Sequence, residues 1–287
     1  MIEKLGPLYD KTLRRVGPLH KLTRAIIWNG GDALVKILSA LRQFELPPDR
    51  LLPLYKLAMF IGTYELETVQ VCKRLIHPGM TIIDIGAHVG YYTFLFSKLA
   101  GTTGRVYAFE PHPRNFEILK RNVERHRLDN VTLIQKAVSD KTCNAIFYET
   151  PLSMGHSLLP VKSYSNKISV ETVSLSHFLQ QEGVKEVGLI KMDVEGGEPE
   201  VLEGISGLLK DAHDLSIILE FKPSILLKRK YEPTDLLKKL FPMDFEVFVI
   251  KSNGNLIRVQ PDDAARIVSS IEKCNLLAQK SAKVLGT

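Results

Sequence analysis

Apolar residues along this chain follow two different spacings, and the alternation between them predicts strands followed by helices. Short, mostly apolar runs are typical of buried strands, and they occupy residues 82–85, 104–110, 131–140, 186–193 and 215–221. Elsewhere apolar residues recur every three to four positions, which indicates helices, at residues 91–100, 114–128 and 198–210. Strands that alternate with helices are typical of a mostly parallel, twisted sheet, so we predict an α/β fold.

The alternation is interrupted after residue 140. Two strand-like runs, 143–149 and 168–174, enclose a segment rich in Pro, Ser and Gly. This pattern predicts an inserted β-hairpin over about residues 141–175. We expect its loop to overhang the ligand pocket of the domain.

The C-terminal part predicts a second hairpin and a helix. Residues 245–250 and 256–259 are strand-like and are separated by Ser252-Asn-Gly-Asn255, a turn sequence. We therefore expect an antiparallel strand at one edge of the sheet. From Pro261 onward, the spacing of the apolar residues predicts a helical tail.

The N-terminal part differs from the rest of the chain. Short helical pieces are broken at Gly6-Pro7, Gly17-Pro18 and Gly30-Gly31. We expect a helical extension over residues 1–60 and one larger domain over residues 61–287.

The basic charge of the chain is concentrated near its start. The net charge is +6, and residues 1–75 carry twelve Lys and Arg against seven Asp and Glu, while the remainder carries 26 against 25. An enzyme that acts on nucleic acid should show a basic track beside its pocket, so we do not expect a nucleic-acid partner. The basic region is either a solvated helical arm or a peripheral contact for an anionic membrane surface or an acidic substrate.

Targeting signals and the spacing of cysteines give little information on the function of the protein. No apolar run reaches the roughly 18 residues of a membrane-spanning helix, and the first 22 residues lack the apolar core of a secretory signal. The three cysteines are widely spaced and provide neither a disulfide framework nor a metal ligand set. We expect a cytoplasmic protein.

The segment from Asp84 to Gly90 is the best candidate for a ligand site. It joins a buried strand to an apolar helix through Gly86 and Gly90, and glycines let the backbone approach a ligand closely. The free N–H groups at the start of the helix favour an anionic group such as a carboxylate. A plain strand-to-helix turn is the alternative, but the arrangement favours a nucleotide-like ligand.

The residues of this turn distinguish between nucleotides. A phosphate-binding loop needs Lys followed by Ser or Thr, which is absent, and His88 stands where a dinucleotide fingerprint has its second glycine. Asp84 would repel a pyrophosphate but favours a sulfonium and an ammonium group. These features favour S-adenosylmethionine, an adenosine derivative without phosphate.

Acidic residues end the following strands. Glu110 can accept hydrogen bonds from both ribose hydroxyls, and Asp140 can accept one from the adenine amino group. Asp193 ends a further strand. Because ligands of open α/β sheets bind at the carboxyl ends of the strands, these acids should line one pocket.

At these residues the chain resembles the FkbM family of methyltransferases, which belong to the class I, Rossmann-like enzymes that use S-adenosylmethionine. The similar segments cover roughly residues 60–225 and are Gly62–Glu65, Asp84–Tyr92, Phe109–Pro111, Ala137–Asp140 and Lys191–Glu198. The family usually has Asn where this chain has His88. The resemblance implies the class I fold, S-adenosylmethionine as cofactor, and O-methylation of a sugar or another small metabolite.

Together, the residues and the resemblance give one set of cofactor-binding candidates. It comprises Tyr64, Glu65, Asp84, Gly86, Ala87, His88, Gly90, Glu110, Pro111, Asp140 and Asp193. The resemblance suggests that Tyr64 and Glu65 close over the methionine end, although they could also form a pair on a helix surface.

The catalytic candidates are acids and one histidine. Methyl transfer to a hydroxyl gains from a base that removes its proton, and Asp193 and Glu195 suit that role, with Glu195 as the expected base. His156, in the insertion, is a second candidate. The alternatives are helix capping for Glu195 and simple solvent exposure for His156. Lys191 should face the same side of its strand as Asp193 and could form an ion pair with it.

Other functions are less consistent with the sequence. The Asn-Pro-Pro-Tyr segment of adenine amino methyltransferases is absent. Asp193, Glu195 and Glu220 could bind a metal ion, but magnesium-dependent relatives place Asp-Asn where this chain has Glu220-Phe-Lys222, so we expect none. The remaining alternatives are methylation of RNA or another macromolecule, and a non-catalytic protein that keeps the fold for binding.

Overall fold

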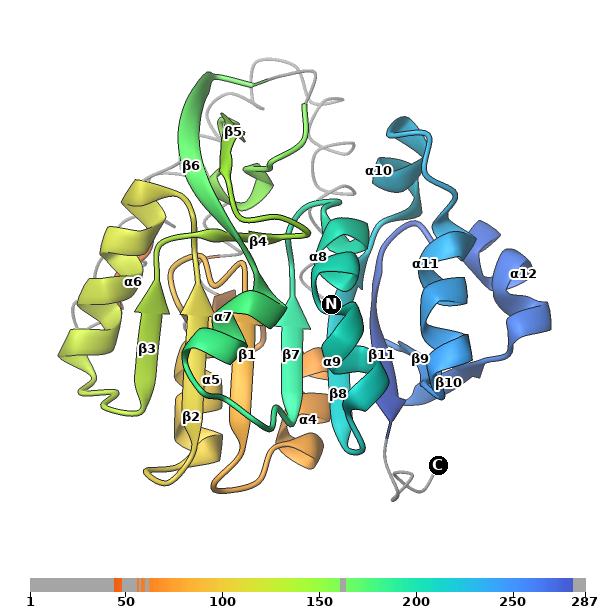
Figure 1. Ribbon diagram of the computed structural model, residues 1–287, viewed down its shortest axis with the longest axis horizontal. Helices are drawn as coiled ribbons and strands as arrows, with labels where there is room; N and C mark the ends of the chain where they lie inside the picture. Colours follow the sequence, from red (N-terminus) through yellow and green to blue (C-terminus); the bar gives the residue numbers. More distant parts are fainter. Residues whose placement is uncertain (1–43, 48–55, 57, 60–61, 161–163, 281–287) are drawn as a thin grey trace, which may run out of the picture.

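The computed structural model describes residues 44–47, 56, 58–59, 62–160 and 164–280. Figure 1 shows a large central sheet with helices on both faces and a smaller sheet above one end of it. The predicted helical extension over residues 1–60 and its basic surface lie almost wholly outside the described residues. Across the described part of the chain, no helix is long and apolar enough to cross a membrane.

The central sheet has eight strands in the order β10-β9-β11-β8-β7-β1-β2-β3. Its strands are β1 (Thr81–Ile85), β2 (Arg105–Phe109), β3 (Val131–Ile134), β7 (Leu189–Met192), β8 (Leu215–Phe221), β9 (Glu246–Ile250), β10 (Leu256–Val259) and β11 (Cys274–Lys280). Strands β3, β2, β1, β7 and β8 pair in parallel. This confirms the predicted α/β class, and the antiparallel pairing of β10 with β9 at the edge confirms the predicted hairpin.

The helical tail predicted from Pro261 onward is wrong for most of its length. Among the residues from Pro261 onward that the structure describes, α12 (Ala264–Ser269) is the only α-helix, and β11 follows it. β11 lies between β9 and β8 and is antiparallel to both. Because Leu276, Leu277 and Ala278 are all buried, this strand lacks the alternation of apolar and polar residues by which a strand is recognised.

The helices cover both faces of the sheet. They are α4 (Leu66–Leu75), α5 (Tyr91–Ala100), α6 (Pro113–Arg125), α7 (Leu175–Gln181), α8 (Glu198–Gly204), α9 (Ser206–Asp211), α10 (Pro223–Lys228), α11 (Pro233–Leu240) and α12. Helices α4 and α5 pack on one face, around Phe96, and α7, α8, α9, α11 and α12 contribute to the core on the other. Figure 1 shows α7, α8 and α9 in front of the sheet.

Two predicted elements are divided in the structure. The run 131–140 forms β3 in the central sheet and β4 (Ala137–Ser139) in the smaller sheet. The helix predicted over residues 198–210 breaks at Gly204, where a Cβ would overlap the carbonyl oxygen of Ser139. The two divided elements meet at this point, because α8 packs tightly against β4.

The predicted insertion is confirmed as an antiparallel pair. β5 (Asn144–Glu149) pairs with β6 (Asn166–Ser174), and β4 pairs with the other edge of β6 in parallel. A short 3-10 helix, η1 (Ser153–Gly155), lies in the loop between β5 and β6. In Figure 1 this small sheet stands above the carboxyl ends of the parallel strands.

Candidate active site

The turn from β1 to α5 needs glycine at two positions. Gly86 has φ of +81°, and a Cβ there would overlap the carbonyl oxygen of Asp193. Gly90 caps α5 with φ of +95°, and a Cβ there would lie 2.7 Å from Leu119 Cδ1. His88 also has a positive φ, of 53°, which is uncommon for a residue with a side chain. The turn is therefore held against both β7 and α6.

A cavity of about 350 Å³ lies at the carboxyl ends of the parallel strands. The predicted site residues that line it are Tyr64, Asp84, Gly86, Ala87, His88, Glu110, Pro111, Asp140, His156, Asp193 and Glu195. Gly90 and Glu65 do not line it, although the Glu65 carboxylate approaches that of Asp193. Asp140 follows β4 rather than a strand of the central sheet, but it reaches the same cavity.

Glu110 is fixed in place by backbone donors. Its Oε2 accepts from the His88 N–H at 2.8 Å and its Oε1 from the His112 N–H at 3.0 Å. Burial raises the pKa of Glu110 to about 7, although these hydrogen bonds act in the opposite direction. Its carboxyl group can therefore change charge near neutral pH, in the wall of the cavity.

Asp84 lies on the other side of the turn and is fully buried. Its Oδ2 accepts from Thr93 Oγ1 at 2.6 Å, whereas its Oδ1 has no hydrogen-bond partner among the described residues. Burial raises the pKa of Asp84, and the positive charge of Lys191 counteracts this. The predicted ion pair is confirmed, since Lys191 Nζ lies 3.5 Å from Asp193 Oδ2.

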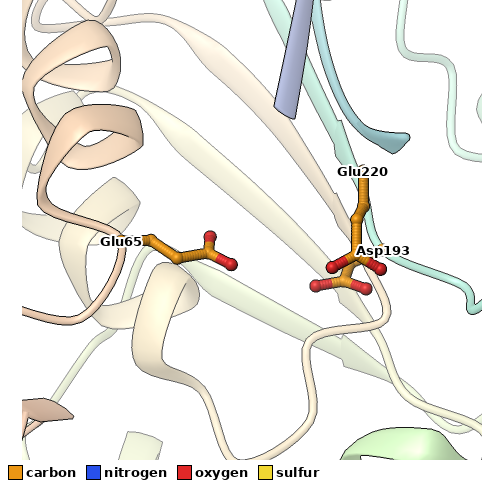
Figure 2. Close-up of side chains that lie close together, drawn as sticks. All are labelled: Glu65, Asp193 and Glu220. Atoms are coloured by element: carbon orange, nitrogen blue, oxygen red, sulfur yellow. The ribbon is translucent and has the colours of Figure 1, made fainter. Parts of the chain in front are cut away.

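Three carboxylates point toward one another where β7, β8 and the start of α4 meet. Figure 2 shows Glu65 opposite Asp193 and Glu220, and each offers an oxygen within 4.8 Å of the others. Such a set of oxygens could bind a divalent cation. This set differs from the predicted one, because it contains Glu65 and not Glu195.

Lysines balance the charge of these acids. Lys191 pairs with Asp193, and Lys222 and Lys273 both contact Glu220, which is almost fully buried. Burial raises the pKa of Glu220 to about 8, because removal from water disfavours its charge. Three ammonium groups thus lie among these acids, and together they form an acid–lysine network.

Glu195 is held by the same network. Both of its carboxylate oxygens lie 2.8 Å from Lys222 Nζ, and its backbone has φ of +52°. Burial and the nearby Asp193 raise the pKa of Glu195, while Lys222 lowers it. Asp193 behaves differently: burial acts to raise its pKa, but Lys191 and Lys222 bring the pKa below its usual value.

His156 belongs to the insertion and lines the cavity. Its Nδ1 accepts a hydrogen bond from the Thr150 N–H at 3.0 Å, and its ring centroid lies 4.4 Å from that of His112. With Nδ1 acting as the acceptor, the neutral ring carries its proton on Nε2. This geometry favours His156 as a hydrogen-bond donor and not as the base.

Several residues of the site were not predicted. Lys222 directly follows β8, so its position at a strand end was a usable signal. Lys273 directly precedes β11, a strand that the pattern did not reveal. Ser153 lies in the insertion and reaches the cavity only through the fold of that segment.

The parallel sheet, the glycine turn against β7 and the acid-lined cavity above it define a class I methyltransferase that uses S-adenosylmethionine. Comparison with known families agrees, since residues 84–247 match the methyltransferase FkbM domain. The chain belongs to the FkbM methyltransferase family.

The individual relatives match this chain at low sequence identity. The 31-O-demethyl-FK506 methyltransferase FkbM of Streptomyces tacrolimicus is 29% identical over an alignment of 160 residues, and the match covers 45% of this chain and 61% of that protein. The hexuronic acid methyltransferase AglP of Haloferax volcanii is 25% identical over 172 residues, 59% of this chain and 65% of that protein. The chain thus spans less than two thirds of either relative. Among solved structures, an O-methyltransferase from Bacillus cereus aligns over 97% of this chain and 99% of its own, at 14% identity and a TM-score of 0.47.

Proposed function

We propose that this protein transfers a methyl group from S-adenosylmethionine to a hydroxyl of a small metabolite or a sugar. The observation that carries the proposal is that Glu195 and Asp193 line the same cavity as the glycine turn and Glu110. Carboxylates that could serve as a base thus line the same cavity as the glycine turn. The names of two relatives, which specify a demethylated FK506 and a hexuronic acid, agree with small hydroxylated acceptors.

In this proposal the walls of the cavity place the donor. Glu110 accepts hydrogen bonds from the ribose hydroxyls, and Asp140 faces the adenine. Asp84 and Tyr64 enclose the methionine end, where negative charge favours the sulfonium and the ammonium group. Most of the catalytic effect then comes from positioning, because the sulfonium is already a good leaving group.

The chemical step is a displacement at the methyl carbon. The acceptor oxygen bonds to this carbon, the bond from carbon to sulfur breaks, and its electron pair stays on sulfur as a neutral thioether. Glu195 takes the proton of the acceptor hydroxyl. Lys222 holds the Glu195 carboxylate in place, and Asp193 orients the acceptor.

The test is a screen of sugars, glycans and hydroxylated metabolites with S-adenosylmethionine labelled on its methyl group. Glu195→Gln should lower turnover of the acceptor found by about 10²- to 10⁴-fold, as expected for loss of a general base, and should leave S-adenosylhomocysteine affinity within about twofold. Glu203→Gln, at an exposed acid on α8, is the matched control.

Two results would contradict the proposal. Unchanged turnover in Glu195→Gln would show that Glu195 is not the general base. Methyl transfer to nitrogen acceptors alone would show that the accepting group is not a hydroxyl. The same assay with a chelator should proceed at an unchanged rate, because lysines balance the acids of the cavity.

A further inference from the structure

The loop between β5 and β6 forms a roof over the cavity. We call residues 150–159 the roof loop, and five of them line the cavity: Ser153, Met154, His156, Leu158 and Leu159. The glycine turn and Glu110 line the same cavity. A donor bound in this cavity would therefore be in reach of both the turn and the roof loop.

The roof loop is anchored at several places that do not involve the turn. The Ser157 hydroxyl donates to the Glu195 carbonyl oxygen at 3.2 Å, and Ser157 also pairs with the backbone of Tyr148. At its start, Glu149 forms an ion pair with His112 at 2.6 Å. Met154 packs on the small apolar cluster that includes Met59 and Tyr64. None of these contacts involves His88.

A side-chain hydrogen bond joins the roof loop to the glycine turn. His88 Nε2 lies 2.7 Å from Ser153 Oγ, and the two residues are 65 positions apart in the chain. The His88 backbone is fixed by its positive φ and by its N–H bond to Glu110. Ser153 is largely buried. The bond thus joins two residues that line the same cavity, one in the roof loop and one in the turn that contacts Glu110.

We propose that His88 and Ser153 are positioning residues, and that their hydrogen bond holds the roof loop closed over the bound donor. The bond stabilises the closed cavity and slows the release of both S-adenosylmethionine and its product. His88 takes part through the length of its side chain, which carries Nε2 to Ser153. Asparagine tolerates the positive φ of this position well, but its side chain is too short to place a nitrogen where His88 Nε2 lies. The inference does not depend on the acceptor.

The experiment measures dissociation of S-adenosylhomocysteine from the full chain by stopped-flow competition. Ser153→Ala and His88→Asn should each raise the dissociation rate by about fivefold, the effect of losing one hydrogen bond. The double variant should be no faster than either single variant, because both remove the same bond. His88→Gln, whose amide reaches the position of Nε2, should restore the slow rate.

Ser165→Ala is the matched control, since the Ser165 hydroxyl donates to Glu149 in the same insertion but does not line the cavity. It should leave the dissociation rate unchanged. An unchanged rate in Ser153→Ala would overturn the proposal, as would additive single effects or a His88→Gln variant as fast as His88→Asn. An equal increase in Ser165→Ala would overturn it too, because it would indicate general loosening. Failure of the wild type to bind S-adenosylhomocysteine would instead contradict the cofactor assignment.

Discussion

At the scale of single residues, the contact between Gly86 and Asp193 joins the donor-binding turn to the end of β7. Gly86→Ala should lower the free energy of unfolding by at least about 2 kcal/mol, because it combines a positive φ with an overlap against backbone. Gly183→Ala is the control, since Gly183 also has a positive φ, of 66°, but nothing lies near its Cβ position. It should cost only about 1 kcal/mol. Urea unfolding of both variants would show whether they differ.

The raised pKa of Glu110 predicts a pH-dependent affinity for the donor. With a pKa of about 7, Glu110 holds a proton at lower pH, and in the binding mode proposed above this proton must leave before both oxygens can accept from the ribose. Affinity for S-adenosylhomocysteine should therefore rise from pH 6 to pH 8. Glu110→Gln should weaken binding about tenfold or more at pH 8, as expected for hydrogen bonds to a charged group, and should flatten the pH dependence. Calorimetry across this range measures both, and an equally steep dependence in the variant would refute the role of Glu110.

The sequence predicted which acids line the cavity more completely than it predicted the residues that pair with these acids. Asp84, Glu110 and Asp193 each lie at or just beyond a strand end, and strand ends can be located from the sequence. The pairing of Glu195 with Lys222 could not be predicted, because it depends on the separation of β7 and β8 in space and on the strained backbone of Glu195.

At the scale of elements, β11 contributes more to stability than its sequence suggests. Leu277 is fully buried between β8 and β9. Leu277→Ala should lower the free energy of unfolding by about 2–5 kcal/mol, the usual cost of such a cavity. Ile257→Ala on β10, where the side chain is 47% exposed, should cost less than about 1 kcal/mol. Equal costs in chemical denaturation would show that β11 is not a core strand.

The spacing of apolar residues located strands that lie in the sheet beside a strand close to them in chain order. β1, β2 and β8 match their predicted ranges closely, and β5 and β6 pair as expected. The separation of β3 from β4 was not visible, because residues 131–140 read as one apolar run. The pairing of β4 with β6 in the smaller sheet shows that the chain leaves the central sheet there.

At the scale of the whole molecule, buried acids make stability depend on pH. Burial raises the pKa of Glu110 and of Glu198 to about 7 and that of Glu220 to about 8, from 4.5. Between the pKa of 4.5 in the unfolded chain and the raised pKa values in the folded state, the folded state binds more protons than the unfolded chain. The stability of the unliganded protein should therefore fall as pH rises from about 5 to about 8.

Urea unfolding at a series of pH values tests this sign. Glu198→Gln should flatten the decline, because its side chain is buried and its neutral amide does not titrate. Glu186→Gln, at an exposed acid, should leave the slope unchanged. Stability that rises across this range in the wild type would contradict the predicted sign.

The position of β11 also affects how the chain can fold during synthesis. β8 and β9 leave the ribosome before β11, yet they are joined in the sheet only through it. Until residues 274–280 emerge, the nascent chain presents two unpaired apolar strand edges, which favour association with other chains. A ribosome-stalled chain without these seven residues should therefore depend on chaperones to remain unaggregated, even though it already contains every acid of the donor cavity.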